Sequence, residues 1–393
     1  MTVVTDRLHH VDVAPSVVTI GVFDGVHRGH RALLDRVRDE ARTRGMRAVA
    51  VTFDRHPMAV LDPAERPPAL QTLDDKVASL EASGIDHVHV LTFDRTASRE
   101  PAVGFATRVL GGPLAARHVV VGTNFRFGHG AVGDVALLER LGADLGFTVE
   151  GFDLVDVGQE AVSSSRIRDA LARGDVAWAA EALGRPHRLS GSVVRGDGRG
   201  RTIGVPTANV SVVPGLALPA AGVYATRVRR RGPDGPTGPV WDAVTNIGTR
   251  PTFDGRDVTV EAHLLDVEVD LYDQEVVVDV LERLRDERRF DDVDALVTQI
   301  HDDIAAGRAV LGHPAPEQAD ETQDADVADV ADVAGDPDLL ARPDGPDTTD
   351  TTDGPAHEPE LPDEPASPPL FRDAPAGRRR PGADAPDDRP GRP

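Results

Sequence analysis

The sequence predicts three consecutive parts: an α/β domain with a Rossmann-like parallel sheet, a small antiparallel β-barrel with a closing helix, and a disordered acidic tail. From about residue 16 to 184, apolar runs of strand length alternate with helical patterns, which is typical of a parallel sheet covered on both faces. From about 189 to 280, short β-rich segments are broken by Gly and Pro. The expected bounds of the three parts are 1–186, 187–312 and 313–393.

The first domain is expected to place its ligand site at one edge of the sheet. Its predicted strands are short apolar runs at 17–20, 48–53, 87–93 and 119–122, with a helix over 73–82. Ligands of open α/β sheets bind outside the carboxyl ends of the strands. Polar loops follow three of these ends, at 24–25, 54–57 and 122–130, so we expect these loops to converge on one crevice.

The second domain has strand patterns separated by turn residues. The predicted strands lie at 192–194, 222–225, 258–265 and 276–278. Apolar and polar residues alternate clearly over 258–264, which indicates a strand with one face in the core. A closing helix is expected over 293–306, ended by Gly307.

The tail after His313 lacks the means to form a core. It is rich in Pro, Asp, Ala and Gly, and residues 325–333 repeat the triplet Ala-Asp-Val. Such a segment cannot bury enough apolar area to offset the entropy of ordering. We therefore expect a disordered, solvated spacer, and the sequence indicates no partner for it.

Composition excludes several classes of protein. The chain has 393 residues, a formal net charge of -23 and no cysteine, so disulfides, thiolate catalysis and Cys-based zinc sites are excluded. The negative charge disfavours nucleic-acid binding. The N-terminus has no apolar signal segment and no apolar run is long enough to span a membrane, so we expect a cytoplasmic protein. Because Lys76 is the only lysine, a Walker A loop cannot exist.

The most informative segment is Gly21-Val-Phe-Asp-Gly-Val-His-Arg-Gly-His30. It follows an apolar strand and precedes an amphipathic helix expected to open near Gly29. The start of a helix offers unpaired backbone N–H groups and a partial positive charge, which together bind anions. Two histidines at this start, His27 and His30, can both point toward a phosphate. The alternatives are a surface cap or a metal site.

Two further segments support a phosphate site. The loop from Gly122 to Gly128 holds Asn124, Phe125 and Phe127, whose rings can stack on a planar ligand or form a small core under the loop. The turn Ser163-Ser-Ser-Arg-Ile-Arg168 opens a helix. One serine is explained as an N-cap, and a second hydroxyl with Arg168 can clamp a triphosphate.

These three motifs resemble the adenylyltransferase module of prokaryotic bifunctional riboflavin kinase/FAD synthetases. That module belongs to the nucleotidyltransferase superfamily, marked by the His27-x-Gly-His30 pair. The resemblance implies that the phosphate of FMN attacks the α-phosphorus of ATP, giving FAD and pyrophosphate. The two histidines would stabilise charge on the phosphates and act as neither a metal site nor a cap. The residues implied in ATP and FMN binding are Gly21, Asp24, Asn124, Phe125, Phe127, Ser164, Ser165 and Arg168.

The chain departs from the pattern of this module at two positions. Ser165 stands where the family usually has Thr, and the hydroxyl is retained. Arg55 stands where Pro is common, which affects the expected shape of the flavin side.

A second motif lies at the start of the second domain. Gly196, Gly198 and Gly200 can let backbone amides approach a phosphate, and nearby arginines supply charge, although a Gly/Arg loop alone is usually a flexible turn. The following Pro-Thr-Ala-Asn places Thr207 and Asn209, whose oxygens are hard ligands suited to Mg²⁺.

A kinase also gains from a base beside the attacking hydroxyl, and Glu261 lies mid-strand on the same face as Thr259 and His263. An exposed barrel carboxylate is the alternative. The Gly-rich loop, Pro-Thr-Ala-Asn and the Glu261 segment resemble the riboflavin kinase module, which implies that Glu261 accepts the ribityl hydroxyl proton. The residues implied in ATP, flavin and Mg²⁺ binding are Gly196, Gly198, Arg199, Gly200, Thr207, Asn209 and Arg285. Asp273 replaces a usual Gly, so a strained or reshaped turn is expected there.

The leading interpretation is a bifunctional enzyme that converts riboflavin to FMN and FMN to FAD, with ATP as co-substrate and Mg²⁺ as cofactor. Two alternatives stay open: one silent module, or a flavin-binding regulator without turnover. Expected partners are the small-molecule substrates, without nucleic acid or membrane. Whether the chain forms a homo-oligomer stays open.

Overall fold

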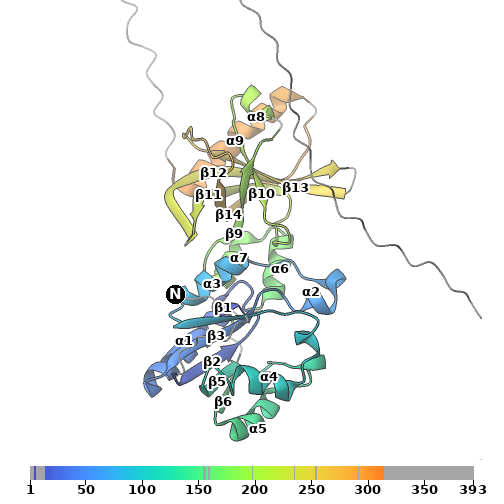
Figure 1. The fold of residues 1–393 in the computed structure, drawn as a ribbon. Helices are drawn as coiled ribbons and strands as arrows, with labels where there is room; N and C mark the ends of the chain where they lie inside the picture. Colours follow the sequence, from blue (N-terminus) through green and yellow to red (C-terminus); the bar gives the residue numbers. More distant parts are fainter. Residues whose placement is uncertain are drawn as a thin grey trace, which may run out of the picture. The chain divides into compact units, whose positions relative to one another are not determined.

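The computed structural model describes residues 4–5, 14–153, 156–157, 160–196, 198–233, 235–252, 255–290 and 292–313. Its first domain is a six-stranded parallel sheet in the order β1-β4-β3-β2-β5-β6 (Figure 1). The strands are β1 Val4–Thr5, β2 Ser16–Ile20, β3 Arg47–Phe53, β4 His87–Leu91, β5 Ala116–Gly122 and β6 Thr148–Phe152. The predicted parallel sheet is therefore confirmed.

Helices cover both faces of this sheet, as the unbroken apolar strands require. They are α1 Arg28–Arg44, α3 Leu73–Ala82, α4 Ala102–Val109 and α5 Val135–Leu145. The short helix α2, Met58–Leu61, buries none of its residues. Successive residues of β2 enter opposite cores: Val17 packs with the buried side chains of α1 and α3, and Val18 with those of α4 and α5. Figure 1 shows α1 and α4 on opposite faces. A two-stranded ribbon, β7 Asp156–Val157 and β8 Glu160–Ala161, follows.

The second domain is a closed antiparallel barrel with strand order β10-β13-β12-β11-β14-β9. The strands are β9 His187–Val194, β10 Ala208–Val212, β11 Gly222–Gly232, β12 Gly235–Thr252, β13 Gly255–Leu264 and β14 Glu275–Asp286, with the single-turn helix α8 Arg199–Thr202 after β9. The barrel confirms the prediction. The long strand β12 was not predicted, since its Gly and Pro residues mask the alternation.

Two helices, α6 Ser164–Ala172 and α7 Val176–Leu183, precede the barrel. Their apolar faces do not enter the two cores of the sheet. Ile167, Leu171 and Leu183 belong instead to the same buried cluster as Leu189 and Val278 of the barrel. The helix that carries the Ser164 motif is thus supported by the packing of the second domain.

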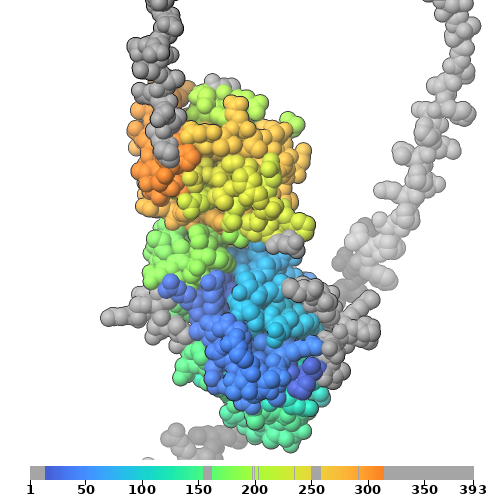
Figure 2. Space-filling view, turned by 90° about the vertical axis from the view of Figure 1, so that its left-hand side faces the viewer, coloured from blue at the N-terminus to red at the C-terminus, as the bar shows by residue number. Residues whose placement is uncertain are grey.

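The closing helix α9, Val293–Leu311, lies against β11, β12 and β14 (Figure 1), and Figure 2 shows it in orange beside the yellow strands. The prediction that Gly307 ends this helix is wrong: the helix runs to Leu311 and Gly312 caps it at a φ of 66°. Gly307 is needed for close packing, because a Cβ there would lie 2.5 Å from Cγ2 of Val244. The predicted disorder after residue 313 lies outside the described residues.

Candidate active sites

The turn between β2 and α1 has an unusual backbone. Phe23, Gly25 and Val26 have φ angles of 51°, 85° and 40°. Positive φ is rare for non-glycine residues and strained for a β-branched residue such as Val26. A residue with such a conformation is held there by its surroundings, so the contacts of this turn identify what holds it.

The carbonyl groups of this turn are held by donors from separate parts of the chain. The Val22 carbonyl accepts from Thr52 Oγ1 at 3.1 Å and Lys76 Nζ at 3.3 Å. The Asp24 carbonyl accepts from Ser164 Oγ at 2.9 Å. Further along, Arg185 Nη2 donates to Gly25 at 3.2 Å and Arg31 Nε to Val26 at 3.3 Å. With its carbonyls engaged by protein donors, the turn is left to offer N–H groups at the start of α1 to an anion.

His27 and His30 form one stacked pair at this helix start. Their ring centroids are 3.6 Å apart and the ring planes differ by 15°. The prediction that neither histidine is a cap is wrong, because His27 is the N-cap of α1 and its Nδ1 accepts from the His30 N–H at 3.3 Å. A side-chain acceptor satisfies one of the free N–H groups of the first turn. The helix begins at Arg28, slightly earlier than expected.

Both imidazoles are neutral in the free protein. Burial, and then the Arg168 charge, lower the pKa of His27 to about 4. Burial, then His27 and Lys76, hold the pKa of His30 well below its usual value. The Nδ1 of His30 is buried without a hydrogen-bond partner among the described residues. A buried polar atom without a partner is costly, and a ligand phosphate would supply one.

Asp24 joins the turn to α6. Its carboxylate accepts the Leu70 N–H at 2.9 Å and forms an ion pair with Arg168 Nη2. Arg168 Nε also donates to the Pro68 carbonyl at 2.6 Å. The structure therefore brings Asp24, Ser164 and Arg168 together, as expected from the motifs, but they contact one another directly.

Some polar residues at the start of α6 contact the β2–α1 turn, and others cap the helix or face solvent. Ser163 is the N-cap, as predicted for one serine, and accepts the Arg166 N–H at 3.3 Å. Ser164 and Arg168, four residues apart, contact the turn at Asp24, and Ser165 is exposed.

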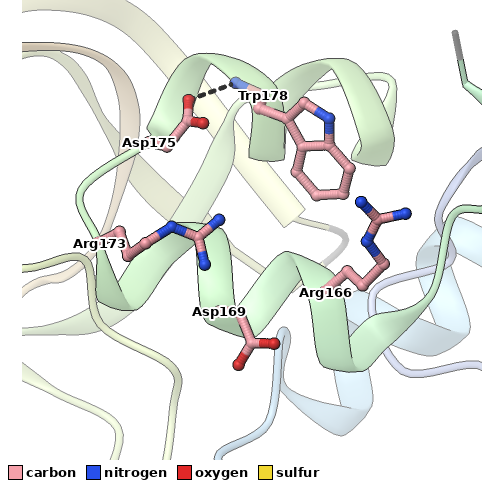
Figure 3. Close-up of a pocket in the computed structure, with 5 residues that line it drawn as sticks. All are labelled: Arg166, Asp169, Arg173, Asp175 and Trp178. Carbon is pink, nitrogen blue, oxygen red and sulfur yellow. Dashed lines mark hydrogen bonds between the residues drawn. The ribbon is translucent and has the colours of Figure 1, made fainter. Parts of the chain in front are cut away.

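A different face of α6 borders a surface pocket of about 460 Å³. Figure 3 shows its five lining residues. The backbone N–H of Trp178 donates to Asp175 Oδ1 at 3.0 Å, and the Arg166 guanidinium carbon lies 5.5 Å from the centroid of the Trp178 ring. This hollow contains none of the predicted site residues.

An apolar pocket of about 410 Å³ opens at the carboxyl ends of the parallel strands. Its wall includes Gly21, Phe53 and Leu91 together with Phe125 and Phe127 of the predicted loop. The small core predicted under that loop is confirmed, whereas stacking on a planar ligand stays a prediction. Phe127 is buried and packs on Phe105, whereas the half-buried Phe125 stacks on Phe127 with centroids 5.4 Å apart. Asn124 is exposed, and its Oδ1 would lie 2.9 Å from a Cβ on Gly122.

A second pocket, of about 300 Å³, lies on the outside of the barrel beneath α9. It collects the predicted residues Gly200, Thr207, Glu261 and Arg285. Glu261 is in register with Asn209 on one side and Asn246 on the other. Its neighbours in β13, Val260 and Ala262, are buried in the barrel, so Glu261 points outward.

The Gly-rich loop leads into this pocket. Gly198 has a φ of 70° and precedes α8. A Cβ on Gly196 would lie 2.3 Å from the Asn209 amide, and one on Gly200 would lie 2.3 Å from the Val205 carbonyl. These two glycines thus permit the loop backbone to lie close to Asn209 and Val205. Their predicted approach to a phosphate stays a prediction. The side chain of Arg199 lies outside the described residues.

Arg285 holds the closing helix in place. Its guanidinium donates to both carboxylate oxygens of Asp303 on α9, each at 2.7 Å. Such a bidentate pair fixes geometry as well as charge. Sequence reasoning named Arg285 for ligand binding but missed Asp303, for which an acidic residue on a helix gives no local signal. It also missed Lys76 and Thr52.

Comparison with known proteins was made for both domains. Residues 10–166 match the family model described as FAD synthetase, and residues 183–311 match that described as riboflavin kinase. A bifunctional riboflavin kinase/FMN adenylyltransferase of Escherichia coli strain K12 is 38% identical over 312 residues, which cover 79% of this chain and 98% of that protein. The Pseudomonas fluorescens protein of the same name is 40% identical over 301 residues, covering 76% and 94%. The chain belongs to the bifunctional riboflavin kinase/FMN adenylyltransferase family.

A solved structure extends this family relation to the fold. A Streptococcus pneumoniae protein, titled a macrolide-efflux protein, matches with a TM-score of 0.71 and 28% identity over 78% of this chain and 99% of that one. In the chain described here, none of the helices formed by the described residues combines the length and the apolar character of a membrane span.

Proposed function

We propose that this protein makes FAD from riboflavin in two ATP-dependent steps, one in each domain. In the first step a riboflavin hydroxyl attacks the γ-phosphorus of ATP, giving FMN and ADP. In the second the FMN phosphate attacks the α-phosphorus of another ATP, giving FAD and pyrophosphate. The observation that carries the proposal is the presence, in one chain of this family, of two separately built pockets that each adjoin residues suited to phosphate.

In the adenylyl-transfer site, the start of α1 would hold the ATP phosphates, with His27 and His30 beside it. Because both rings are neutral in the free protein, they would act as hydrogen-bond donors to the phosphates, and charge stabilisation would be their main contribution. Ser164 and Arg168 would hold the departing pyrophosphate. Asp24 would orient Arg168 through their ion pair. Asn124 would position the phosphates, and the apolar pocket with Phe125 would receive the flavin ring.

In the kinase site, Glu261 would accept the proton of the ribityl hydroxyl as that oxygen attacks the γ-phosphorus. The loop from Gly196 to Gly200 would approach the ATP phosphates, with Arg199 adding charge. Arg285 would act through Asp303 by fixing α9 over the pocket. A base at this position is expected to contribute about 10²–10⁴-fold to the rate.

The oxygens of Thr207 and Asn209 fit a magnesium ion delivered with ATP. Both residues are half-buried, and Asn209 lies close enough to Gly196 that no side chain could stand between them. Mg²⁺ usually keeps several waters and binds through few protein oxygens plus substrate phosphates. The ion would neutralise phosphate charge.

Product chromatography tests this proposal. The protein is incubated with Mg²⁺ and ATP, in one reaction with riboflavin and in another with FMN. We expect FMN and then FAD from riboflavin, and FAD directly from FMN. A silent adenylyltransferase would give FMN from riboflavin but no FAD in either reaction. Flavin binding without any product would support a regulator.

A further inference from the structure

Lys76, the only lysine of the chain, is buried at the edge of the sheet where the strands end. It lies on α3 and its residue is 7% exposed. Its Nζ donates to the Phe53 carbonyl at 2.6 Å and to the Val22 carbonyl at 3.3 Å. Burying an ammonium group is costly unless it is paired and hydrogen-bonded. These two bonds are therefore a specific arrangement and not an incidental contact.

The two carbonyls belong to the two parts of the adenylyl-transfer site. Val22 opens the strained turn that leads to the start of α1, and Phe53 is the last residue of β3. Both residues also border the apolar pocket of about 410 Å³. Lys76 thus connects the backbone of the phosphate turn to the backbone of the pocket wall.

We propose that Lys76 is a positioning residue for adenylyl transfer, whose ammonium clamps the turn after β2 to the end of β3 and so sets the flavin pocket against the phosphate turn. The inference rests on the proposed function. Misplacement of reacting groups by as little as about 1 Å can lower a rate by about 100-fold. The Lys76 ammonium would not contact the substrates itself; it would position the backbone segments that bind them.

The protonation of the clamp gives it a testable signature. Burial lowers the pKa of Lys76 to about 8, against the opposing effects of Asp24 and Asp54. The other titratable groups that face it are His30 and His56, whose pKa values are lowered below the usual histidine value. Raising the pH through about 8 therefore removes the charge of the clamp while the histidines stay neutral.

The experiment compares Lys76→Met, which keeps the volume and removes the ammonium, with Lys76→Arg, which keeps the charge. The matched control is Thr52→Val, which removes a neutral donor to the same Val22 carbonyl. FAD formation from FMN and FMN formation from riboflavin are measured on each full-length protein from pH 6.5 to 9.5.

We expect Lys76→Met to lower kcat/KM for FAD formation by about 100-fold, Lys76→Arg to recover part of it, and Thr52→Val to cost less than about fivefold. FAD formation by the unaltered protein should fall above pH 8, a decline absent from Lys76→Met. FMN formation from riboflavin should be unchanged in all variants, because Lys76 lies in the first domain, and circular dichroism of each variant measures whether that domain keeps its folded structure.

Equal FAD formation by Lys76→Met and the unaltered protein would overturn the inference. A decline above pH 8 that persists in Lys76→Met would also overturn it. If Lys76→Met loses folded structure, the pH profiles of the unaltered protein and Lys76→Arg decide: a decline at the same pH in both contradicts the clamp. Absence of FAD from the unaltered protein would instead reject the proposed function.

Discussion

The two proposed sites of this chain are built in different ways. The adenylyl-transfer site is centred on backbone, since its turn has positive φ at Val26 and its carbonyls are held by donors from several elements. The kinase site is centred on side chains that project from barrel strands, and α9 closes it through the Arg285–Asp303 pair. The first depends on a strained turn that donors from several elements hold, and the second on a helix that packs against three strands and is tied to the barrel by the Arg285–Asp303 pair.

This difference indicates how each site should fail. A strained turn is kept only while the surrounding contacts persist, so loss of one buried contact should affect both stability and FAD formation. A side chain on a regular strand can be changed with little effect on the strand itself. Damage to the kinase site should therefore be confined to its chemistry.

The largest expected effects come from one substitution in each site. Glu261→Gln should lower FMN formation from riboflavin by about 10²–10⁴-fold because the hydroxyl loses its base. His30→Ala should lower FAD formation from FMN by about 10²–10³-fold because charge stabilisation on the phosphates is lost. Each variant should keep the other activity, as measured by separate assays from riboflavin and from FMN. Loss of both activities in a folded variant would contradict two independent sites.

Two ion pairs of different exposure test how much the contacts of the β2–α1 turn contribute to stability. Asp24→Asn removes a buried carboxylate from the partly buried Arg168 and should reduce the free energy of unfolding by about 3 kcal/mol. Asp266→Asn removes the carboxylate paired with Arg308 on a more exposed part of the barrel, and should cost no more than about 1 kcal/mol. Urea unfolding of the two full-length variants measures both. Equal costs would show that the turn is not held as described.

Acid should weaken the protein through its buried histidines. Burial, followed by the nearby His87 and Arg108, lowers the pKa of His89 to about 4, from an ordinary value of 6.5. Both its ring nitrogens lack a hydrogen-bond partner in the part of the chain that the structure describes. Because the unfolded chain binds the proton more readily, stability is full above pH 6.5 and falls as the pH drops toward 4, by about 2 kcal/mol at pH 5 from this residue.

The test of this pH effect is a substitution at the same site. His89→Phe should be more stable than the unaltered protein at pH 7.5, and its advantage should grow at pH 5, as measured by urea midpoints. The exposed His301 on α9 gives a control, since His301→Phe should leave the difference between the two pH values in place. An advantage of His89→Phe that does not grow at pH 5 would contradict the assigned cause.

The smallest expected effect concerns a strained turn outside both sites. Asp273 has a φ of 60°, which confirms the strain predicted where the family usually has Gly. Asp273→Gly should raise the free energy of unfolding by up to about 1 kcal/mol, because glycine adopts positive φ without steric cost. Thermal unfolding measures this as a rise in Tm. A lower Tm would show that the Asp273 side chain contributes contacts that outweigh the strain.

Local sequence patterns were sufficient for most elements and motifs. The continuous apolar runs identified β2, β3, β4 and β5 but not the edge strands β1 and β6, and the helix over 73–82 was predicted with the bounds that the structure has. The patterns could not show that His27 caps α1, because the ring of a cap and that of a ligand look alike in sequence. Gly307 failed as a helix end for a related reason: its small size serves packing against Val244, which lies far away in the chain.

Long-range contacts were the main part that sequence could not supply. Nothing near Lys76 in the chain indicates that its ammonium reaches one carbonyl in the turn after β2 and another at the end of β3. The sequence also does not reveal that Asp303 pairs with Arg285, since acidic residues on predicted helices are usually exposed to solvent. Both contacts depend on tertiary packing that places separate elements side by side.

The most direct test of two complete and separate sites mixes the single-site variants. His30→Ala and Glu261→Gln are each incubated with riboflavin, ATP and Mg²⁺, and then incubated together, with flavins separated by chromatography. Each variant alone should form little FAD, because His30→Ala stops at FMN and Glu261→Gln makes little FMN. The mixture should form FAD, since FMN released by the first variant is adenylylated by the second. A mixture that accumulates FMN without FAD would contradict the account.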